Sequence, residues 1–169
     1  MGGPAFMVHL RHPLPAESVE LLNGRLRVEM LDVERQRSSW RFRTSRGTCQ
    51  ASLAVVPFGA ESAGGGEVTA QTTDDDEIAA ITRALGYRPA ASLQFDNFCG
   101  SDLTGHRELA KFAASVALEY LGVIDVGDLD ITEWMPDVTD DVRLPTGRRL
   151  LAPRTFLRWC DHESFHLEK

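Results

Sequence analysis

Apolar and polar residues alternate in several short segments of this 169-residue chain, and segments with helical spacing lie between them. The clearest alternation is Trp40-Arg-Phe-Arg43, which predicts a strand with one apolar face and one arginine-rich face. Because a sheet must bury its apolar face against another element, such strands need a cover. Further strands are predicted at 6–10, 26–32, 51–58 and 92–98, with a hairpin at 123–126 and 129–131 and a closing strand at 165–167.

Helical patterns are found at 15–22, 73–86, 102–121 and 153–160. The first is expected to end before Gly24, and the longest is expected to end at Gly122. Strands and helices interleave without a strict βαβ rhythm. The predicted fold class is therefore α+β, with an antiparallel or mixed sheet covered on one face by two or three helices.

The chain length suits one domain that spans residues 1–169. A flexible loop is predicted at 59–66, because three consecutive glycines are costly to order. Glu67 follows these glycines where a phosphate-binding loop would need a lysine and a hydroxyl. The segment is therefore interpreted as a surface loop.

The charge is divided unevenly: residues 1–58 sum to +3 and residues 59–169 to -10, which gives the net charge of -7. An acidic balance argues against general nucleic-acid binding, which depends on cations. The acidic balance is consistent with a surface that is only solvated, or with a surface that binds a basic protein. A nucleic-acid contact through the four arginines near Trp40 remains an alternative, although a solvated strand face has the same pattern: Arg35, Arg37, Arg41 and Arg43.

Three cysteines, Cys49, Cys99 and Cys160, are far apart and odd in number, so no disulfide framework is expected. This cysteine usage predicts a reducing, cytoplasmic location. The N-terminal segment does not have the charged start and apolar run of a signal peptide, and no segment has the length of a membrane span. No membrane association is predicted.

The segment 98–111, FCGSDLTGHRELAK, places Cys99 and His106 near the start of the longest helix. A thiol there could act as a nucleophile if His106 reached it, so these two residues are weak catalytic candidates. No orienting carboxylate or oxyanion pocket can be identified around them. Capping by Ser101 or Thr104 explains the segment with fewer assumptions, and no catalytic residue is assigned.

Cys160, His162 and His166 near the C-terminal end are weak candidates for metal ligands. Their spacing matches no recognised metal motif, and Cys160 falls where the last helix is expected to pack. Neither a metal nor a cofactor is therefore predicted.

Three motifs stand out in the C-terminal half: Asp102-Leu-Thr-Gly-His-Arg-Glu-Leu-Ala110, Leu121-Gly-Val-Ile-Asp-Val-Gly127 and the segment 155–169, which begins Thr155-Phe-Leu-Arg-Trp159. Through these motifs the chain resembles a family of small bacterial proteins of unknown function that is common in actinomycetes. The resemblance implies no catalytic residues. In size and acidity the chain also resembles immunity proteins, which neutralise toxins by covering an active site, and this likeness is an analogy.

The predicted function is that of a cytoplasmic protein-binding module, immunity-like or antitoxin-like, that meets a basic partner through acidic surface. The residues expected at this surface are Asp137, Asp140, Asp141 and Trp134. A small enzyme that uses the cysteine and histidine residues or a metal is the alternative. Enzyme activity is left open, although no complete catalytic constellation supports it, and self-association is also open.

Overall fold

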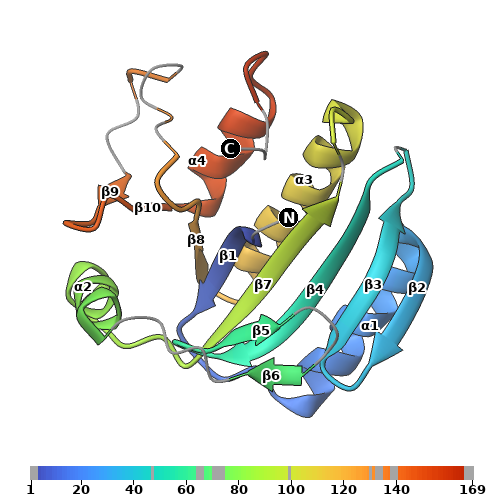
Figure 1. Cartoon of the computed structure of the whole chain (residues 1–169), viewed down its shortest axis with the longest axis horizontal. Coiled ribbons are helices and arrows are strands. Elements are labelled where there is room, and N and C mark those ends of the chain that lie inside the picture. The colour runs from blue at the N-terminus through green and yellow to red at the C-terminus, as the bar shows by residue number, and fades with distance from the viewer. Residues whose placement is uncertain are drawn as a thin grey trace.

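The computed structural model of the chain describes residues 4–46, 48–63, 67–69, 75–98, 100–129, 131, 135–137 and 141–165. In this part of the chain, eight strands form an antiparallel sheet in the order β2-β3-β4-β7-β1-β8-β10-β9 (Figure 1). The strands are β1 Pro4–Leu10, β2 Met30–Gln36, β3 Ser39–Thr44, β4 Gln50–Pro57, β7 Ala91–Phe98, β8 Gly122–Asp125, β9 Val142–Arg143 and β10 Arg149–Leu151. A small hairpin of β5 Glu61–Ala63 and β6 Glu67–Thr69 lies in front of the sheet in Figure 1.

Three helices, α1 Ala16–Glu29, α3 Leu103–Glu119 and α4 Pro153–Cys160, cover one face of the sheet (Figure 1). The fourth helix, α2 Asp75–Leu85, lies apart from them, near β8 and β10. The predicted α+β class and the helical cover on one face are confirmed, and the sheet is antiparallel throughout.

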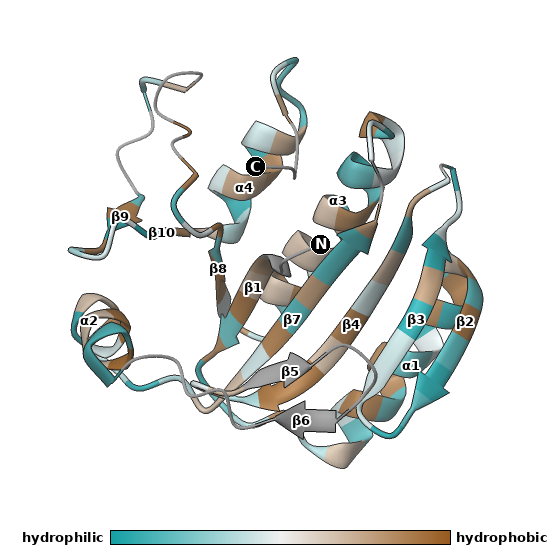
Figure 2. Ribbon diagram, viewed as in Figure 1, coloured by the Kyte–Doolittle hydropathy of each residue, from teal (hydrophilic) through white to brown (hydrophobic). Residues whose placement is uncertain are grey.

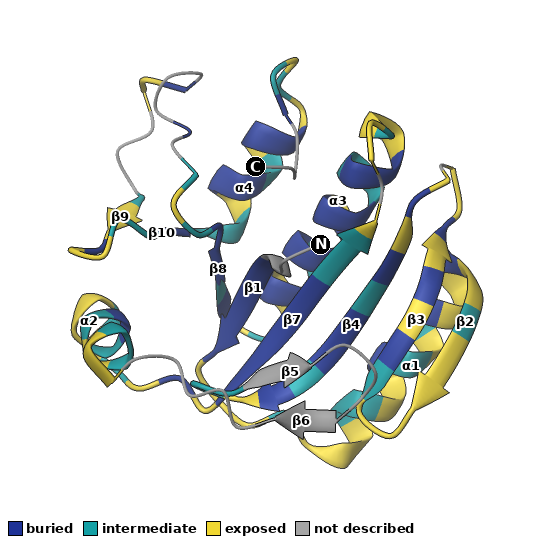
Figure 3. Cartoon of the chain, viewed as in Figure 1, coloured by how far each residue is buried: buried dark blue, intermediate teal, exposed yellow. Residues whose placement is uncertain are grey.

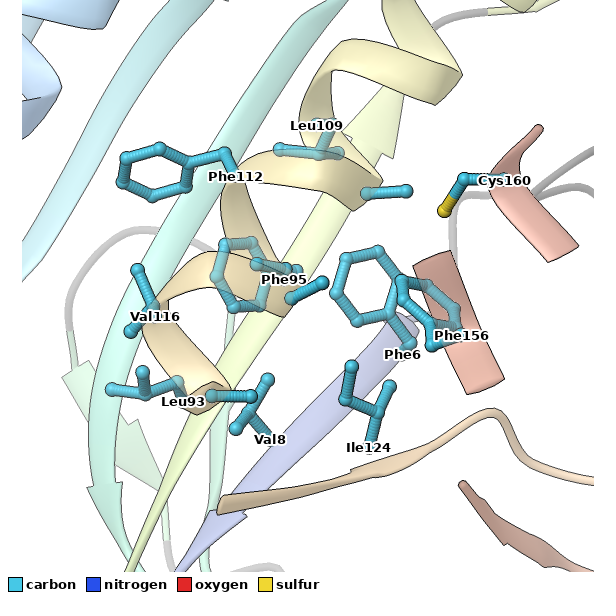
Figure 4. Close-up of a cluster of buried hydrophobic side chains, with 14 of the residues drawn as sticks. Phe6, Val8, Leu93, Phe95, Leu109, Phe112, Val116, Ile124, Phe156 and Cys160 are labelled. Atoms are coloured by element: carbon cyan, nitrogen blue, oxygen red, sulfur yellow. The ribbon is translucent and has the colours of Figure 1, made fainter. Parts of the chain in front are cut away.

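The main core fills the space between the sheet and these three helices (Figure 4). Phe6 of β1 and Phe95 of β7 stack with their ring centroids 4.9 Å apart. Phe156 of α4 packs against Phe6 at a centroid distance of 5.5 Å. Burying each such side chain contributes roughly 1.5–3 kcal/mol, so this contact helps to hold α4 against the strands.

The strand β2 forms one edge of the sheet and is exposed along most of its length (Figure 3). Its pairing with β3 shifts register between Leu31 and Glu34, and Asp32 has a φ angle of 51°. The strand therefore carries a bulge that interrupts the row of backbone groups at this edge.

The first helix is longer than predicted, because α1 continues through Gly24 to Glu29. The predicted strand at 26–32 is wrong in its first half. Leu22, Leu26 and Met30 are all buried at a spacing of four, whereas Val28 is 86% exposed. The helical spacing of the buried residues prevails over the alternation seen in the sequence.

The predicted hairpin around Gly127 is also wrong, since β8 pairs with β1 and β10 and residues 129 and 131 belong to no strand. Gly122 does not cap α3. Leu121 takes the left-handed conformation instead, with a φ angle of 53°, and Gly122 begins β8.

The remaining boundary predictions concern two short segments. Phe165 is buried but lies outside any strand, and the rest of the predicted closing strand, 166–167, lies outside the described residues. Of the predicted glycine-rich loop, residues 61–63 form β5 and residues 64–66 are not among those described.

We predict that Gly122→Ala lowers the free energy of unfolding by about 1–3 kcal/mol. An added Cβ would lie 2.7 Å from Val8 Cγ1 and 3.2 Å from the carbonyl oxygen of His9. Gly24→Ala is the matched control, because nothing lies within 4 Å of its Cβ. Alanine is the better helix former, so that variant should gain roughly 0.5–1 kcal/mol. Urea unfolding measures the free energy of unfolding of both variants. If both variants lost the same free energy, the contact of the added Cβ with Val8 would not explain the loss at position 122.

Candidate functional site

Three polar side chains lie together on the face of the sheet opposite α1, α3 and α4. His9 of β1 and Ser92 of β7 are paired positions, and Asp125 of β8 pairs with the residue two before His9. Their neighbours Val8 and Ile124 point into the main core. Because side chains alternate between the two faces of a strand, His9, Ser92 and Asp125 point the other way and meet.

The imidazole of His9 joins the other two side chains. Its Nδ1 atom lies 2.9 Å from Ser92 Oγ, and its Nε2 atom lies 3.1 Å from Asp125 Oδ2. An ionised carboxylate can only accept, so in the neutral imidazole Nε2 carries the proton and Nδ1 accepts from the Ser92 hydroxyl. His9 is 3% exposed, and Ser92 and Asp125 are each 1% exposed. The order of groups is that of a serine–histidine–aspartate triad with the ring nitrogens exchanged.

Asp125 is stabilised as a carboxylate by further donors. The Nη2 atom of Arg148 lies 2.8 Å from Asp125 Oδ2, and the Gly127 amide donates to Asp125 Oδ1 at 2.9 Å. Arg148 Nε also lies 2.7 Å from Glu77 Oε1, a contact that is electrostatic rather than a well-aligned hydrogen bond. Burial by itself would raise the pKa of Asp125, but the His9 hydrogen bond and the Arg148 charge outweigh it and lower that pKa.

A small apolar cluster covers this polar network, which we define as His9, Ser92, Asp125, Arg148 and Glu77. Ile81 of α2 packs with Leu144 and Leu150, and Phe58 and Leu85 lie at the margin of this cluster. The Phe58 ring meets the His9 ring edge-on at a centroid distance of 5.2 Å. Helix α2 is thus held over the sheet by one buried isoleucine and by the contact of Glu77 with Arg148.

We predict that Asp125→Asn lowers the free energy of unfolding by about 1–3 kcal/mol at neutral pH, because a neutral amide replaces the buried carboxylate that accepts from His9 and pairs with the partly exposed Arg148. The folded-state pKa of Asp125 is lowered. Its stabilisation is therefore complete above the unfolded pKa of about 3.9 and is lost as the pH falls through the lower folded value. Urea unfolding from pH 7 to pH 3 should show wild type and variant converging only at the acid end.

The exposed Asp75→Asn is the matched control for this prediction and should change stability by no more than about 0.5 kcal/mol. A gap between wild type and Asp125→Asn that stays constant down to pH 3 would contradict the prediction.

The same face of the sheet is uncovered farther along β3, β4 and β7. Arg41, Ser52 and Asp96 form one row across these strands, and Gln50 and Phe98 lie in the next row. Figure 2 shows hydrophilic and hydrophobic residues alternating along β7, as expected for a strand with two different faces. Ser52 Oγ lies 3.0 Å from Asp96 Oδ2, and Phe98 is 62% exposed. We call this surface, defined by Arg41, Gln50, Ser52, Asp96 and Phe98, the open sheet face.

The predicted cysteine and histidine pair is tested only in part. Cys99 lies outside the described residues, and His106 is buried in α3 among the core residues. The expectation of no disulfide is wrong for Cys49, which is disulfide-bonded. Disulfides are typical of oxidising compartments, so cysteine usage no longer argues for a reducing location.

The cap of α3 differs from the prediction. Asp102, rather than Ser101 or Thr104, accepts a hydrogen bond from the Gly105 amide at 3.0 Å. This bond is the main reason why the pKa of Asp102 lies below its ordinary value. Asp102 also accepts from the Thr48 amide, so the cap fixes the loop between β3 and β4 against α3.

The metal candidates lie at the end of α4. Burial raises the pKa of the Cys160 thiol to about 12, and its backbone carbonyl accepts from Arg107 Nε at 3.1 Å. His162 Nδ1 accepts from the Ser164 amide at 3.1 Å. His166 lies outside the described part of the chain, within which no three histidine, cysteine or acidic side chains gather as a metal site would require.

We predict that Cys160 reacts with a thiol reagent at least about a hundredfold more slowly in the folded protein than in urea, because the thiolate is the reactive form. With a pKa of about 12, few of the thiols are ionised at pH 8. Peptide mapping by mass spectrometry follows this residue separately from the other cysteines. Fast labelling of Cys160 in the folded state would show that the thiol is neither buried nor protonated.

Two of the acids predicted to bind a partner form ion pairs within the chain. Asp137 pairs with Arg158 at 2.7 Å, and Asp141 pairs with the buried Arg149. Asp140 and Trp134 lie outside the described residues.

Two arginines of the proposed nucleic-acid surface are also engaged. Arg35 binds Glu20 at 2.8 Å and lies over the Trp40 ring, and Arg43 binds Asp32 at 2.9 Å. Their charge is neutralised locally, which reduces what they offer to phosphate.

Sequence reasoning missed the polar network because its members are distant in sequence. His9 and Ser92 are separated by 83 positions, and His9 and Asp125 by 116. One signal was available. Each of the three is a polar residue that interrupts a predicted apolar strand, and a buried polar residue needs a partner.

Comparison with known proteins places the chain in a family without assigning an activity. The model of DUF6368, a family of unknown function, matches residues 2–169, so the chain belongs to that family. No curated protein and no solved structure matches the chain. Among the helices of the described residues, none combines the length and the apolar character needed to cross a membrane.

Proposed function

We propose that this member of DUF6368 is a protein-binding module of the immunity or antitoxin kind, which holds a basic partner against the open sheet face. The observation that carries the proposal is the charge of the segment that borders this face. Residues 47–82 contain six acidic residues and no lysine, arginine or histidine. A one-signed surface of this kind steers and orients a partner of the opposite sign.

The position of this acidic segment supports the proposal. The β5–β6 hairpin lies in front of β4 and β7 in Figure 1, and α2 lies at the side of β1 and β8. Asp75 and Asp76 are exposed in the first turn of α2, whereas Glu77 is used by Arg148. Ile81 of the same helix packs with Leu150, the residue paired with Asp125, so Asp75 and Asp76 belong to a helix on the side of the sheet that carries the open sheet face.

Elsewhere in the described residues, arginines neutralise many of the acids. Glu119 pairs with Arg25, Glu20 with Arg35, and Asp137 with Arg158. Because these pairs cancel charge locally, the negative charge available to a partner is concentrated in the 47–82 segment. The proposal therefore uses the acids beside the open sheet face, and the binding residues predicted from the sequence, Trp134, Asp137, Asp140 and Asp141, stay a prediction.

The open sheet face also offers anchors for a protein. Phe98 projects from the end of β7, and Arg41 is exposed on β3. Aromatic and arginine side chains supply much of the binding energy at protein interfaces. The alternative of a metal site that uses Cys160, His162 and His166 has weaker support, because burial raises the pKa of the Cys160 thiol to about 12 and a metal binds the thiolate.

A pull-down from the native host at low and high salt, read by mass spectrometry, tests this function with two variants. We expect Phe98→Ser to weaken binding of the retained partner by about tenfold or more, and Asp75→Lys by about fivefold with a smaller salt dependence. Calorimetry with the purified partner measures both effects. Glu17→Lys reverses a charge on α1, on the helical side, and serves as the matched control.

The three variants distinguish this surface from the rest of the molecule. A basic partner that is released by salt and lost with Phe98→Ser, but kept with Glu17→Lys, is the expected result. The proposal would be rejected if the partner bound Phe98→Ser and Asp75→Lys with the affinity of the wild type. It would also be rejected if no polypeptide were retained at either salt concentration.

A further inference from the structure

We propose that Ser92 is an activated nucleophile that accepts an acyl group from an ester, with His9 as its base. This activity goes beyond partner binding and is carried by a separate observation, the polar network. Its distances place a hydroxyl, an imidazole and a carboxylate in hydrogen-bonded sequence, at 2.9 Å and 3.1 Å. A serine is a weak nucleophile unless an adjacent base takes its proton.

The network holds His9 in the form that can act as this base. Asp125 accepts from Nε2, which leaves the lone pair of Nδ1 directed at the Ser92 hydroxyl. Arg148 keeps the carboxylate ionised, and the Phe58 ring limits the rotation of the imidazole from the side. When His9 takes the proton, the Asp125 carboxylate stabilises the imidazolium that forms.

The chemical step balances with groups that are present. Ser92 Oγ forms a bond to the ester carbonyl carbon while its proton moves to His9 Nδ1. The carbon–oxygen bond to the leaving alcohol then breaks, and the alcohol leaves with the proton from Nδ1. Attack by water on the acyl-serine by the same route releases the carboxylic acid and restores both residues.

Ser92 is 1% exposed, so a substrate can reach it only after the side chains that cover this face move apart. Ile81 and Leu85 of α2 belong to the small apolar cluster on this face together with Phe58, and Glu77 of α2 contacts Arg148. Elements with few buried apolar contacts open locally at a small cost in free energy. Opening of α2 exposes the network without breaking the main core, which lies on the other face of the sheet.

Ser52 supplies an internal comparison. It lies on the same face, is less buried than Ser92, and is hydrogen-bonded to the Asp96 carboxylate instead of an imidazole. A carboxylate is a much weaker base than an imidazole. If solvent exposure controlled reactivity, Ser52 would react before Ser92. If the basicity of the hydrogen-bonded group controls reactivity, Ser92 reacts before Ser52.

The test is labelling of the whole chain with a fluorophosphonate, followed by peptide mapping. The reagent bonds its phosphorus to the activated oxygen and releases fluoride, while the proton moves to the imidazole. We expect modification at Ser92 and less than a tenth as much at Ser52. Ile81→Ala, which loosens the cover, should raise the labelling rate severalfold, and His9→Gln should lower it at least tenfold.

Several results would overturn the proposal. These are labelling of Ser52 ahead of Ser92, no labelling of Ser92 even in Ile81→Ala, or labelling of His9→Gln at the wild-type rate. Circular dichroism checks that each variant is folded. The peptide map of the labelled wild-type protein is enough to decide whether Ser92 or Ser52 reacts first. Release of nitrophenolate from p-nitrophenyl acetate, absent in Ser92→Ala and retained in the exposed Ser101→Ala, tests the acyl step.

Discussion

The ion pair between Asp125 and Arg148 is the interaction on which one side of the sheet depends. A carboxylate at that depth would cost several kcal/mol if it were alone. The guanidinium, the His9 ring and the Gly127 amide offset this cost. The same guanidinium contacts Glu77, so one charged group connects β8 with α2. The position of α2 over the sheet and the orientation of the imidazole therefore have a common origin.

The strand β7 links the two parts of this side of the sheet. Ser92, near its start, is covered, whereas Phe98, at its end, is exposed. Six residues separate them, which corresponds to about 20 Å along an extended strand. The two proposals therefore share a strand but rest on different residues.

Local patterns in the sequence account for much of the fold and little of the candidate site. Alternation found the strand at Trp40, and the spacing of apolar residues found α3. The start of β2 was misplaced because Leu26 and Met30 satisfy both a helical and an alternating pattern, and only packing decides between them. The partners of β8 follow from long-range pairing that no local pattern encodes.

The polar network depends on register as well as on residue type. A slip of one residue in β1 would send His9 to the helical side and Val8 to the network. Spacing along the chain instead points to residues that are close in sequence, such as the candidate metal ligands Cys160 and His162. These two residues lie at the end of α4, where Arg107 Nε donates to the backbone carbonyl of Cys160.

The bulge in β2 has a consequence for crowded solutions. Open sheet edges act as templates on which another chain can add a strand, and repeated addition leads to fibrils. At Asp32 the register of this edge is broken, and the opposite edge, β9, is only two residues long. Within the described residues, neither edge gives an incoming strand an uninterrupted row of amides. The sheet is therefore protected against end-to-end polymerisation, although most of β2 is open to solvent.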